Sequence, residues 1–371
     1  MLTRQLGHTD LHITTLGFGA WAIGGAGWTL AWGAQDDEQS VAAIREAVAA
    51  GMNWIDTAPI YGRGHSERVI GRALAGMRER PILATKCGRF DDDEGKLFSD
   101  LCRDTIRREF ERSLELLGVD KIDLYQIHFP EDAQVEEGWR TLVELKQEGL
   151  VGAIGVSNYT VEQMKRSQAI APIDSCQPAY SLVDRAIEQN GVLEFCVEHG
   201  IGVIVYSPQG AGLLTGAITR ERLAAMPRDD WRVKFDVPRF REPELSKNLA
   251  LVELLREIGA RHGGRTPGEV AIAWTLRQPA VTAAIVGLRS PSQVAGVAGA
   301  AEITLTAADL AGIEAHLARP TAAYYWVVNM RSGESYPRQT SNRGQYRSCN
   351  PTPHAHGFIP VRATQPGSFL P

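Results

Sequence analysis

The sequence lacks the features that would place the chain in a membrane, in a secretory pathway or in a disulfide-bonded scaffold. No apolar run among its 371 residues approaches the ~20 residues needed to span a bilayer. The opening segment, MLTRQLGHTD, has no apolar stretch of the kind found in secretory signals. The cysteines, at positions 87, 102, 176, 196 and 349, include no C-x-x-C pair, so neither a zinc site nor a disulfide framework is indicated. We therefore expect a cytoplasmic protein with reduced thiols.

An excess of positive charge is also missing. The 39 Lys and Arg residues against 44 Asp and Glu give a formal net charge of −5 at pH 7, which argues against a nucleic-acid or anionic-membrane binder. Residues 320–371 have another composition, with seven prolines, five arginines, no lysine and one acidic residue. We expect a folded domain over residues 1–319 and a disordered Pro/Arg-rich tail over residues 320–371.

Short β-rich runs alternate with amphipathic helical segments through the folded region. A helix is expected after Asp36, whose N-cap position has Gln39 three residues on, and a long helix is expected to begin at Ser99. The expected strands lie at residues 13–18, 53–56, 81–86, 121–128, 151–158, 173–178, 201–208 and 282–288. Strands that alternate with helices predict a parallel sheet, and this many units over roughly 300 residues predict a (β/α)8 barrel. A doubly wound sheet is the alternative.

Four side chains of catalytic type fall at or just after the C-terminal ends of neighbouring expected strands. Asp56 ends the second strand, and Tyr61 lies in the turn that follows it. Lys86 ends the third strand and His128 the fourth. Each residue alone has an ordinary explanation as a cap, a packing residue or a solvated charge. In a barrel, however, the C-terminal strand ends form one rim, so the four side chains are expected to lie together.

This set of groups meets the needs of carbonyl reduction. The carbonyl oxygen needs a proton as hydride reaches the carbon, but a free tyrosine, with a pKa of about 10, holds its proton too firmly. We expect the ammonium of Lys86 to stabilise the phenolate and to lower the pKa of Tyr61. Asp56 would keep Lys86 charged, and His128 would hydrogen-bond the carbonyl oxygen. The sequence shows neither the nucleophile–base pair of a hydrolase nor a metal site.

The motifs around these residues resemble those of the aldo-keto reductases, particularly bacterial NADP-dependent members, over residues 1–319. They are GMNWIDTAPIYGRGHSE (51–67), ATK (84–86), DLYQIH (123–128), GVSNYT (155–160), QPAYSL (177–182) and YSPQGAGLLTG (206–216). The resemblance implies a (β/α)8 TIM barrel with an N-terminal β-hairpin cap and long loops at the C-terminal rim. It also implies a catalytic tetrad with Tyr61 as the proton donor: Tyr61, Asp56, Lys86 and His128.

The resemblance further implies a hydride donor, NADPH. The family's nicotinamide and pyrophosphate contacts correspond here to Ser157, Asn158, Gln177, Tyr206, Ser207, Gln209, Gly212, Leu213 and Arg232. Arg289 can hold a 2′-phosphate through its planar guanidinium, which favours NADPH over NADH. Gln293 fits the family's adenosine site, and Gly287, in the same motif, is also expected to contact the cofactor. The Glu-Asn pair usual at that end is replaced by Gly296 and Val297, and this departure weakens the expected preference for NADP.

Two other nicotinamide-binding patterns are not supported. Residues 17–22, GFGAWA, imitate the Rossmann glycine fingerprint, but the following IGGAGWTLAWGA cannot begin the helix that would bind a phosphate. Short-chain reductases use Tyr-x-x-x-Lys, and none of the nine tyrosines has a lysine four positions later.

Aromatic residues in loops at the same rim predict an apolar-walled substrate pocket, formed by Trp21, Trp28, Trp32 and Phe129. The first hypothesis is an NADPH-dependent reductase of small aldehydes and ketones. One alternative is a sugar or alcohol dehydrogenase that uses the same site in the oxidative direction. Another is a cofactor-bound sensor subunit with little turnover, like the potassium-channel β subunits that resemble this family. The sequence specifies neither the physiological substrate nor the oligomeric state.

Overall fold

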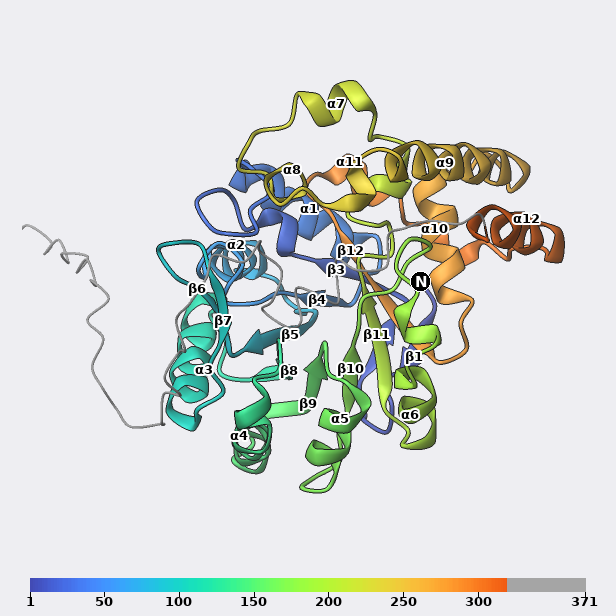
Figure 1. Cartoon of the computed structure of the whole chain (residues 1–371). Helices are drawn as coiled ribbons and strands as arrows, with labels where there is room; N and C mark the ends of the chain where they lie inside the picture. Colours follow the sequence, from blue (N-terminus) through green and yellow to red (C-terminus); the bar gives the residue numbers. More distant parts are fainter. Residues whose placement is uncertain (319–371) are drawn as a thin grey trace, which may run out of the picture. The chain divides into compact units, whose positions relative to one another are not determined.

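The computed structural model describes residues 1–318, in which parallel strands form a closed barrel surrounded by helices (Figure 1). The strands follow one another around the barrel, and the last pairs with the first: β3 (Leu16–Gly19), β4 (Trp54–Asp56), β5 (Ile82–Cys87), β8 (Ile122–Ile127), β9 (Val151–Ser157), β10 (Ser175–Gln177), β11 (Gly202–Tyr206) and β12 (Val281–Gly287). The predicted (β/α)8 TIM barrel is confirmed. The predicted tail, residues 320–371, lies outside the described residues.

Helices connect successive strands and form the outer layer, with α2 to α6 arranged around the strands in Figure 1. They are α1 (Asp37–Ala49), α2 (His65–Leu74), α3 (Arg103–Leu117), α4 (Val135–Gln147), α5 (Val161–Gln168), α6 (Val192–Glu198), α9 (Glu244–Arg261) and α10 (Pro267–Leu276). The expected N-cap of α1 is present, because the Asp36 carboxylate accepts hydrogen bonds from the backbone N–H groups of Glu38 and Gln39.

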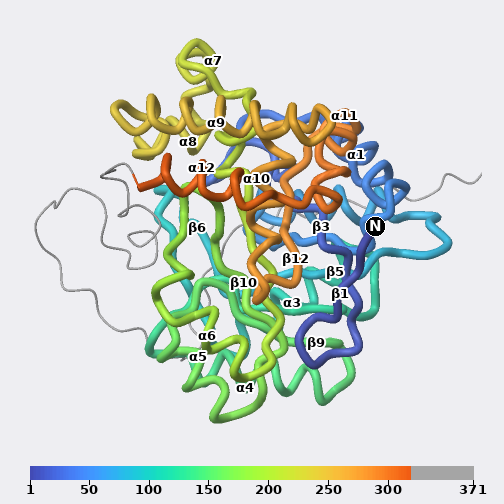
Figure 2. Tube along the Cα trace, turned by 90° about the vertical axis from the view of Figure 1, so that its right-hand side faces the viewer, coloured from blue at the N-terminus to red at the C-terminus, as the bar shows by residue number. Residues whose placement is uncertain are grey.

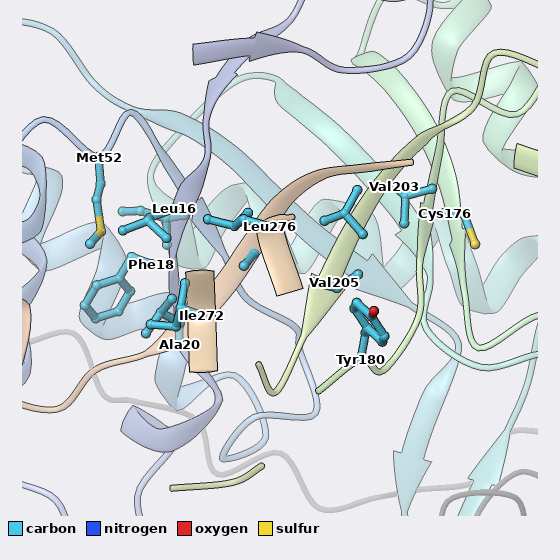
Figure 3. Packing of buried hydrophobic residues seen from close by; sticks show 14 of the residues in the cluster. Leu16, Phe18, Ala20, Met52, Cys176, Tyr180, Val203, Val205, Ile272 and Leu276 are labelled. Carbon is cyan, nitrogen blue, oxygen red and sulfur yellow. The ribbon is translucent and has the colours of Figure 1, made fainter. Parts of the chain in front are cut away.

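The core has one layer between the strands and the helices and a second layer inside the barrel. Members of the outer layer from β3, β11 and α10 appear in Figure 3: Leu16, Phe18, Val203, Val205, Ile272 and Leu276. Inside the barrel, the ring of Trp54 occupies the space beside Gly17, where a Cβ atom would lie 2.1 Å from the indole. Successive side chains of a strand point to opposite faces, so these strands are buried on both sides, as a parallel barrel requires.

An antiparallel hairpin of β1 (Thr3–Gln5) and β2 (His12–Thr14) precedes the barrel. The side chains of Leu6 and Ile13 are buried with the residues inside the barrel, and Leu6 lies against Gly202 at the start of β11. The hairpin therefore closes the N-terminal end of the barrel, opposite the rim, which confirms the expected cap. The expected strand over residues 13–18 is in fact divided between β2 and β3.

The segment between β5 and α3 differs from the sequence prediction that Ser99 begins a helix. Ser99 is the last residue of β7 (Leu97–Ser99), which pairs with β6 (Arg89–Asp91), and α3 begins only at Arg103. The turn between β6 and β7 contains Gly95 at φ +79°, a conformation that favours glycine. A hairpin thus stands at the rim directly after β5.

The C-terminal part of the described chain also departs from expectation. The sequence predicts one helix over residues 290–301, but the structure has a short α11 (Pro291–Ala295) and a separate 3-10 turn (Ala300–Glu302). A further helix, α12 (Ala307–Leu317), follows and lies beside α9 in Figure 2. No single helix in residues 1–318 has the length and apolar composition to cross a membrane, although the bent pair formed by Pro291–Glu302 and α12 passes that test as a unit.

Two long loops pack against each other at the rim. The loop between β11 and α9 carries the short helices α7 (Arg220–Ala224) and α8 (Trp231–Lys234). The indole of Trp231 stacks on that of Trp21, from the loop after β3, with the ring centroids 5.1 Å apart. The backbone N–H of Trp231 also donates to the carbonyl oxygen of Ala31 at 2.9 Å. These contacts hold the two loops together over the C-terminal mouth of the barrel.

Candidate active site

The barrel brings Asp56, Tyr61, Lys86 and His128 together at its C-terminal rim. The ammonium Nζ of Lys86 lies 2.6 Å from Oδ1 of Asp56 and 3.5 Å from the hydroxyl oxygen of Tyr61. The imidazole of His128 meets the ring of Tyr61 edge-on, with the ring centroids 5.6 Å apart. The side chains come from β4, the turn after it, β5 and the residue after β8, so the closure of the barrel assembles the cluster.

The Lys86–Asp56 ion pair is buried. Lys86 also donates to the backbone carbonyl of Thr57 at 2.9 Å, and Gln177 donates from Nε2 to Oδ2 of Asp56 at 2.8 Å. Burial lowers the pKa of Lys86 and raises that of Asp56, while the attraction between the two charges opposes both shifts. The hydrogen bonds satisfy the remaining polar atoms of the pair, as a buried ion pair requires.

The pKa of Tyr61 differs in direction from the sequence prediction. Burial raises it well above the usual value of 10, and the negative charge of Asp56 and the neighbouring Tyr206 raise it further. The expected lowering of this pKa is therefore wrong for this structure, because the loss of hydration of the buried phenolate is the largest influence on it. Tyr61 consequently holds its proton throughout the neutral pH range.

His128 is uncharged at neutral pH. Burial lowers the pKa of its imidazole well below 6.5, and the positive charges of Lys86 and Arg89 lower it further. The backbone carbonyl of His128 accepts a hydrogen bond from Nδ2 of Asn158 at 3.0 Å, which ties the end of β8 to the end of β9. A neutral imidazole at this position can donate one N–H hydrogen bond to a ligand.

Polar side chains from β9, β10 and β11 form a connected group beside the cluster. The hydroxyl of Ser157 donates to the carbonyl oxygen of Gln177 at 2.8 Å. Asn158, in the left-handed conformation at φ +62°, donates from Nδ2 to the Ser157 hydroxyl at 2.9 Å. The hydroxyl of Tyr206 donates to Oδ1 of Asn158 at 2.8 Å, so the Tyr206 ring is held at a fixed angle. These bonds hold the amide of Asn158, the hydroxyl of Ser157 and the ring of Tyr206 next to one another at the rim.

A cavity of about 490 Å3 opens above these groups. Tyr61, His128, Asp56 and the Ser157–Asn158 pair line it, and Lys86 lies beneath it. Its aromatic wall includes every side chain that the sequence assigned to the substrate pocket: Trp21, Trp28, Trp32 and Phe129. The cavity therefore has reactive polar groups at its base and apolar walls, as small-molecule sites commonly do.

Arginines gather at another part of the same cavity. Arg232 pairs with the buried Asp230 at 2.6 Å. Arg289 donates from Nη2 to the carbonyl oxygen of Ala34 at 2.7 Å and from Nε to the side chain of Gln35. The positive charge of Arg232 contributes to the lowered pKa of Arg289, after burial. Cations clustered on a concave surface are suited to phosphate groups.

Comparison with known proteins identifies the family of this chain. The profile of the Aldo/keto reductase family matches residues 15–318. An aldo-keto reductase from Bacillus subtilis is 36% identical over 308 residues, covering 82% of this chain and 90% of the relative. An NADH-specific methylglyoxal reductase from Escherichia coli is 36% identical over 321 residues, covering 82% of this chain and 94% of the relative. The chain belongs to the aldo/keto reductase family.

The likeness extends to solved structures. The glycerol dehydrogenase from Gluconobacter oxydans superposes with a TM-score of 0.76 at 37% identity, covering 85% of this chain and 95% of the other. As a family member, the protein is an oxidoreductase of class EC 1.1.1.- that acts on small carbonyl compounds. Aldo-keto reductases use NAD(P)H, and individual relatives differ in which form they prefer.

The cavity of this aldo-keto reductase contains nearly all the residues that the sequence assigned to a cofactor. Those that line it are Ser157, Asn158, Gln177, Tyr206, Ser207, Gln209, Gly212, Arg232, Gly287, Arg289 and Gln293. Leu213 does not line it, because its side chain is fully buried in a cluster with Trp231 and Phe240. A motif fixes the place of Leu213 in the chain but not the direction of its side chain.

Three arginines that line the cavity of this aldo-keto reductase were missed by the sequence reasoning: Arg89, Arg222 and Arg239. Arg222 and Arg239 belong to the long loop between β11 and α9, whose high arginine content was the available signal. Arg89 follows Lys86 by three residues, so its closeness to the rim was visible in the sequence. Gly296 and Val297, which replace the usual Glu-Asn pair, also line the cavity.

Proposed function

We propose that the protein is an NADPH-dependent reductase of aldehydes and ketones in which Tyr61 donates the proton. The observation that carries the proposal is the position of Lys86 Nζ, 2.6 Å from Asp56 and 3.5 Å from the Tyr61 hydroxyl, beneath the cavity. Bound NADPH would supply the hydride. The chain itself would supply the proton, the orientation of the carbonyl and the exclusion of water.

The proton would come from a tyrosine that is fully protonated before reaction. Because the pKa of Tyr61 is raised, its O–H is present across the neutral range. As the proton leaves, the adjacent ammonium of Lys86 stabilises the phenolate, and this stabilisation is largest in the transition state, where the charge develops. Asp56 holds Lys86 in place. His128, uncharged at neutral pH, would donate an N–H to the carbonyl oxygen and orient it toward Tyr61.

The polar groups of the cavity fit a nicotinamide dinucleotide. The side chains of Ser157, Asn158 and Gln177 offer donors and acceptors to a carboxamide, and the fixed ring of Tyr206 offers a flat face beside them. Arg232 and the other arginines of the loop between β11 and α9 would hold phosphates. Leu213, whose side chain is buried away from the cavity, could contribute only through its backbone.

The preference for NADPH over NADH rests on Arg289. Its guanidinium lines the cavity and is held by the loop that contains Ala34 and Gln35, which fixes its direction. A 2′-phosphate gives such a planar group two oxygens to bind, whereas NADH offers none. The Escherichia coli relative is named NADH-specific, so this preference is a property of the individual chain.

Oxidation of an alcohol at the same site is the second candidate. It is favoured by the similarity to the Gluconobacter oxydans glycerol dehydrogenase. In that direction Tyr61 would have to lose its proton first, which its raised pKa opposes at neutral pH. We therefore favour reduction near neutrality and expect oxidation to require alkaline pH.

The test compares wild type with Tyr61→Phe in NADPH oxidation, using a panel of carbonyl compounds that includes 4-nitrobenzaldehyde. We expect kcat to fall by roughly 10²- to 10⁴-fold, the usual contribution of a positioned acid, while NADPH binding measured by fluorescence stays unchanged. Tyr159→Phe is the matched control, because the Tyr159 hydroxyl is buried without a hydrogen-bond partner and does not line the cavity. Equal rates in wild type and Tyr61→Phe would remove Tyr61 from the chemistry.

A further inference from the structure

Arg89 lies at the substrate part of the cavity and is not explained by binding of the cofactor. It begins β6, three residues after Lys86, and lines the cavity together with Tyr61, His128 and Phe129. We propose that the Arg89 guanidinium binds a carboxylate of the substrate, so that the preferred substrates are aldehydes or ketones with an acidic group. This inference rests on the proposed reductase function and names the substrate class of the same site.

The neighbours of Arg89 separate it from the phosphate-binding arginines. Its guanidinium carbon lies 4.6 Å from the ring centroid of Phe129, and that ring lies 5.3 Å from the imidazole of His128. The charge of Arg89 contributes to the lowered pKa of His128. Arg289, by contrast, is influenced by Asp230, Arg232 and a further arginine of the same loop. Arg89 is thus the cation next to the groups proposed to hold the carbonyl.

Arg89 forms no ion pair within residues 1–318, and only the more distant charge of Glu131 acts on it. Its guanidinium donates one hydrogen bond there, from Nη1 to the neutral hydroxyl of Ser99 at 3.2 Å. Burial lowers its pKa to about 10, with only partial compensation from Glu131, so the group stays charged at neutral pH. A half-buried cation without a partner is unfavourable, and a ligand carboxylate would relieve that cost.

The other charged groups that line the cavity either are paired or lie among the arginines assigned to phosphates. Arg232 is paired with Asp230, Arg239 lies 3.8 Å from Asp184, and Asp56 is paired with Lys86. Arg222 and Arg289 are bound only to neutral oxygens, and the charges of both act on the phosphate side, where burial and then the charges of Arg232 and Arg222 lower the pKa of Arg289. An incoming carboxylate would therefore meet one cation without an ion pair beside the catalytic cluster and no unpaired acid among the described residues of the lining.

The surroundings of Arg89 also hold the guanidinium in a fixed plane. Stacking on Phe129 restrains one face, and the bond to Ser99 links β6 to β7 across the hairpin. The remaining N–H groups make no hydrogen bond within the described chain, and a planar fork of this kind binds both oxygens of a carboxylate. The apolar side chains of Trp28 and Leu97 line the same cavity, which suits a substrate with an apolar body and an acidic end.

The experiment uses two aldehydes of nearly the same shape, 4-carboxybenzaldehyde and its methyl ester, methyl 4-formylbenzoate. We expect wild type to prefer the acid over the ester in kcat/KM by about 10- to 100-fold, which corresponds to a charge-assisted hydrogen bond. In Arg89→Gln that ratio should fall to about 1, mainly through a higher KM for the acid. Arg89→Lys, which keeps the charge but loses the planar fork, should give an intermediate ratio.

The ratio of two substrates within one protein separates recognition of the carboxylate from any general effect on His128 or on folding. Arg277→Gln is the control, because Arg277 does not line the cavity; it should leave the ratio at the wild-type value. The same ratio in wild type and Arg89→Gln, with both aldehydes reduced, would overturn the assignment of Arg89 and leave the proposed function standing.

A binding measurement keeps the inference testable without turnover. Calorimetric titration of the NADP⁺-loaded protein with 4-(hydroxymethyl)benzoate should give a Kd at least about 10-fold weaker for Arg89→Gln than for wild type. Equal Kd values would overturn the inference. Failure of wild type to reduce any neutral or acidic aldehyde would instead contradict the proposed reductase function, whatever the titration gives.

Discussion

Gln177 donates a hydrogen bond from its side-chain Nε2 to Oδ2 of Asp56 at 2.8 Å, across a separation of 121 residues in the chain. The other carboxylate oxygen accepts from Lys86, so both oxygens of Asp56 are bound. The bond links β10 to β4 inside the closed barrel. Gln177 therefore supports the buried ion pair in addition to its proposed contact with the nicotinamide, and its two roles can be measured separately.

Replacing Gln177 by Met should destabilise the protein even without cofactor. Met fills a similar volume but cannot donate, so Oδ2 of Asp56 would be left buried without a partner. We expect the free energy of unfolding to fall by about 1–3 kcal/mol. The measurement is guanidinium unfolding of the cofactor-free protein, with the exposed Gln147→Met as the control. An unchanged free energy of unfolding would mean that the bond to Asp56 gives no net stability.

Replacing Arg289 by Gln should weaken NADPH binding and leave NADH binding nearly unchanged. The proposed contact is to the 2′-phosphate, which NADH lacks, so we expect the Kd for NADPH to rise by about 10- to 100-fold. Gln35→Ala keeps the arginine but removes one of its tethers and should give a smaller increase. Fluorescence titration with both cofactors measures the difference. An equal rise in the Kd for NADPH and for NADH would mean that Arg289 contacts a part of the cofactor that both forms share.

Glu67 should make stability depend on pH. Its carboxyl is buried behind the cluster and accepts a hydrogen bond from the Thr85 hydroxyl at 2.7 Å, and burial raises its pKa from 4.5 to about 7. The folded state then binds the proton more tightly than the unfolded state. Glu67 therefore contributes most stability below pH 4.5, and the contribution declines as the pH rises to about 7.

In Glu67→Gln, which resembles the protonated acid, this decline should be smaller by about 3 kcal/mol. Unfolding in guanidinium at a series of pH values from 4.5 to 8 checks it. Some decline should remain, because burial also raises the pKa of Glu109 to about 8. Glu115→Gln removes an exposed carboxylate from α3 and serves as the control. A slope in Glu67→Gln as steep as in wild type would contradict the assignment to Glu67.

The grouping of side chains at the rim was predictable where a residue lies at the end of a strand. Asp56, Lys86 and His128 lie at or next to strand ends. Barrel geometry brings the C-terminal ends of the strands to one rim, so the positions of these residues along the chain were enough to group them. The bond between Gln177 and Asp56 was not visible, because it depends on which strands face each other across the interior. The pKa of Tyr61 was predicted in the wrong direction, because burial is a property of the assembled cavity and not of neighbouring residues in the chain.

The sequence prediction missed the β6–β7 hairpin and three cavity arginines for a different reason. Residues 89–99 contain the polar run DDDEGK between Phe90 and the pair Leu97–Phe98, a hairpin signal that the helical pattern after it concealed. Arg89 lies in that hairpin, so the sequence placed it near the rim but its position beside His128 followed only once β6 and β7 were known. Arg222 and Arg239 reach the cavity because the loop between β11 and α9 folds back against Trp21, and nothing local in a loop encodes such a return.

Breaking the Lys86–Asp56 pair should cost more stability than removing it entirely. Lys86→Met leaves a buried, unpaired carboxylate and should lower the free energy of unfolding by about 3–5 kcal/mol, whereas Lys86→Met with Asp56→Asn leaves two neutral groups and should recover most of that loss. Removal of the Lys86 charge also takes away an influence that lowers the pKa of Asp56, so Lys86→Met should become less stable as the pH rises.

Urea unfolding of wild type, both single variants and the double variant forms the cycle that tests this pair. A double variant as unstable as Lys86→Met would assign the loss to packing of the lysine stem instead of to the unpaired carboxylate. Activity should follow a different pattern from stability. The double variant should regain stability without regaining turnover, because the phenolate of Tyr61 would still form without an ammonium at 3.5 Å to stabilise it. Recovery of both would mean that Asp56 had inhibited the reaction in the single variant and that Lys86 is not needed for proton donation.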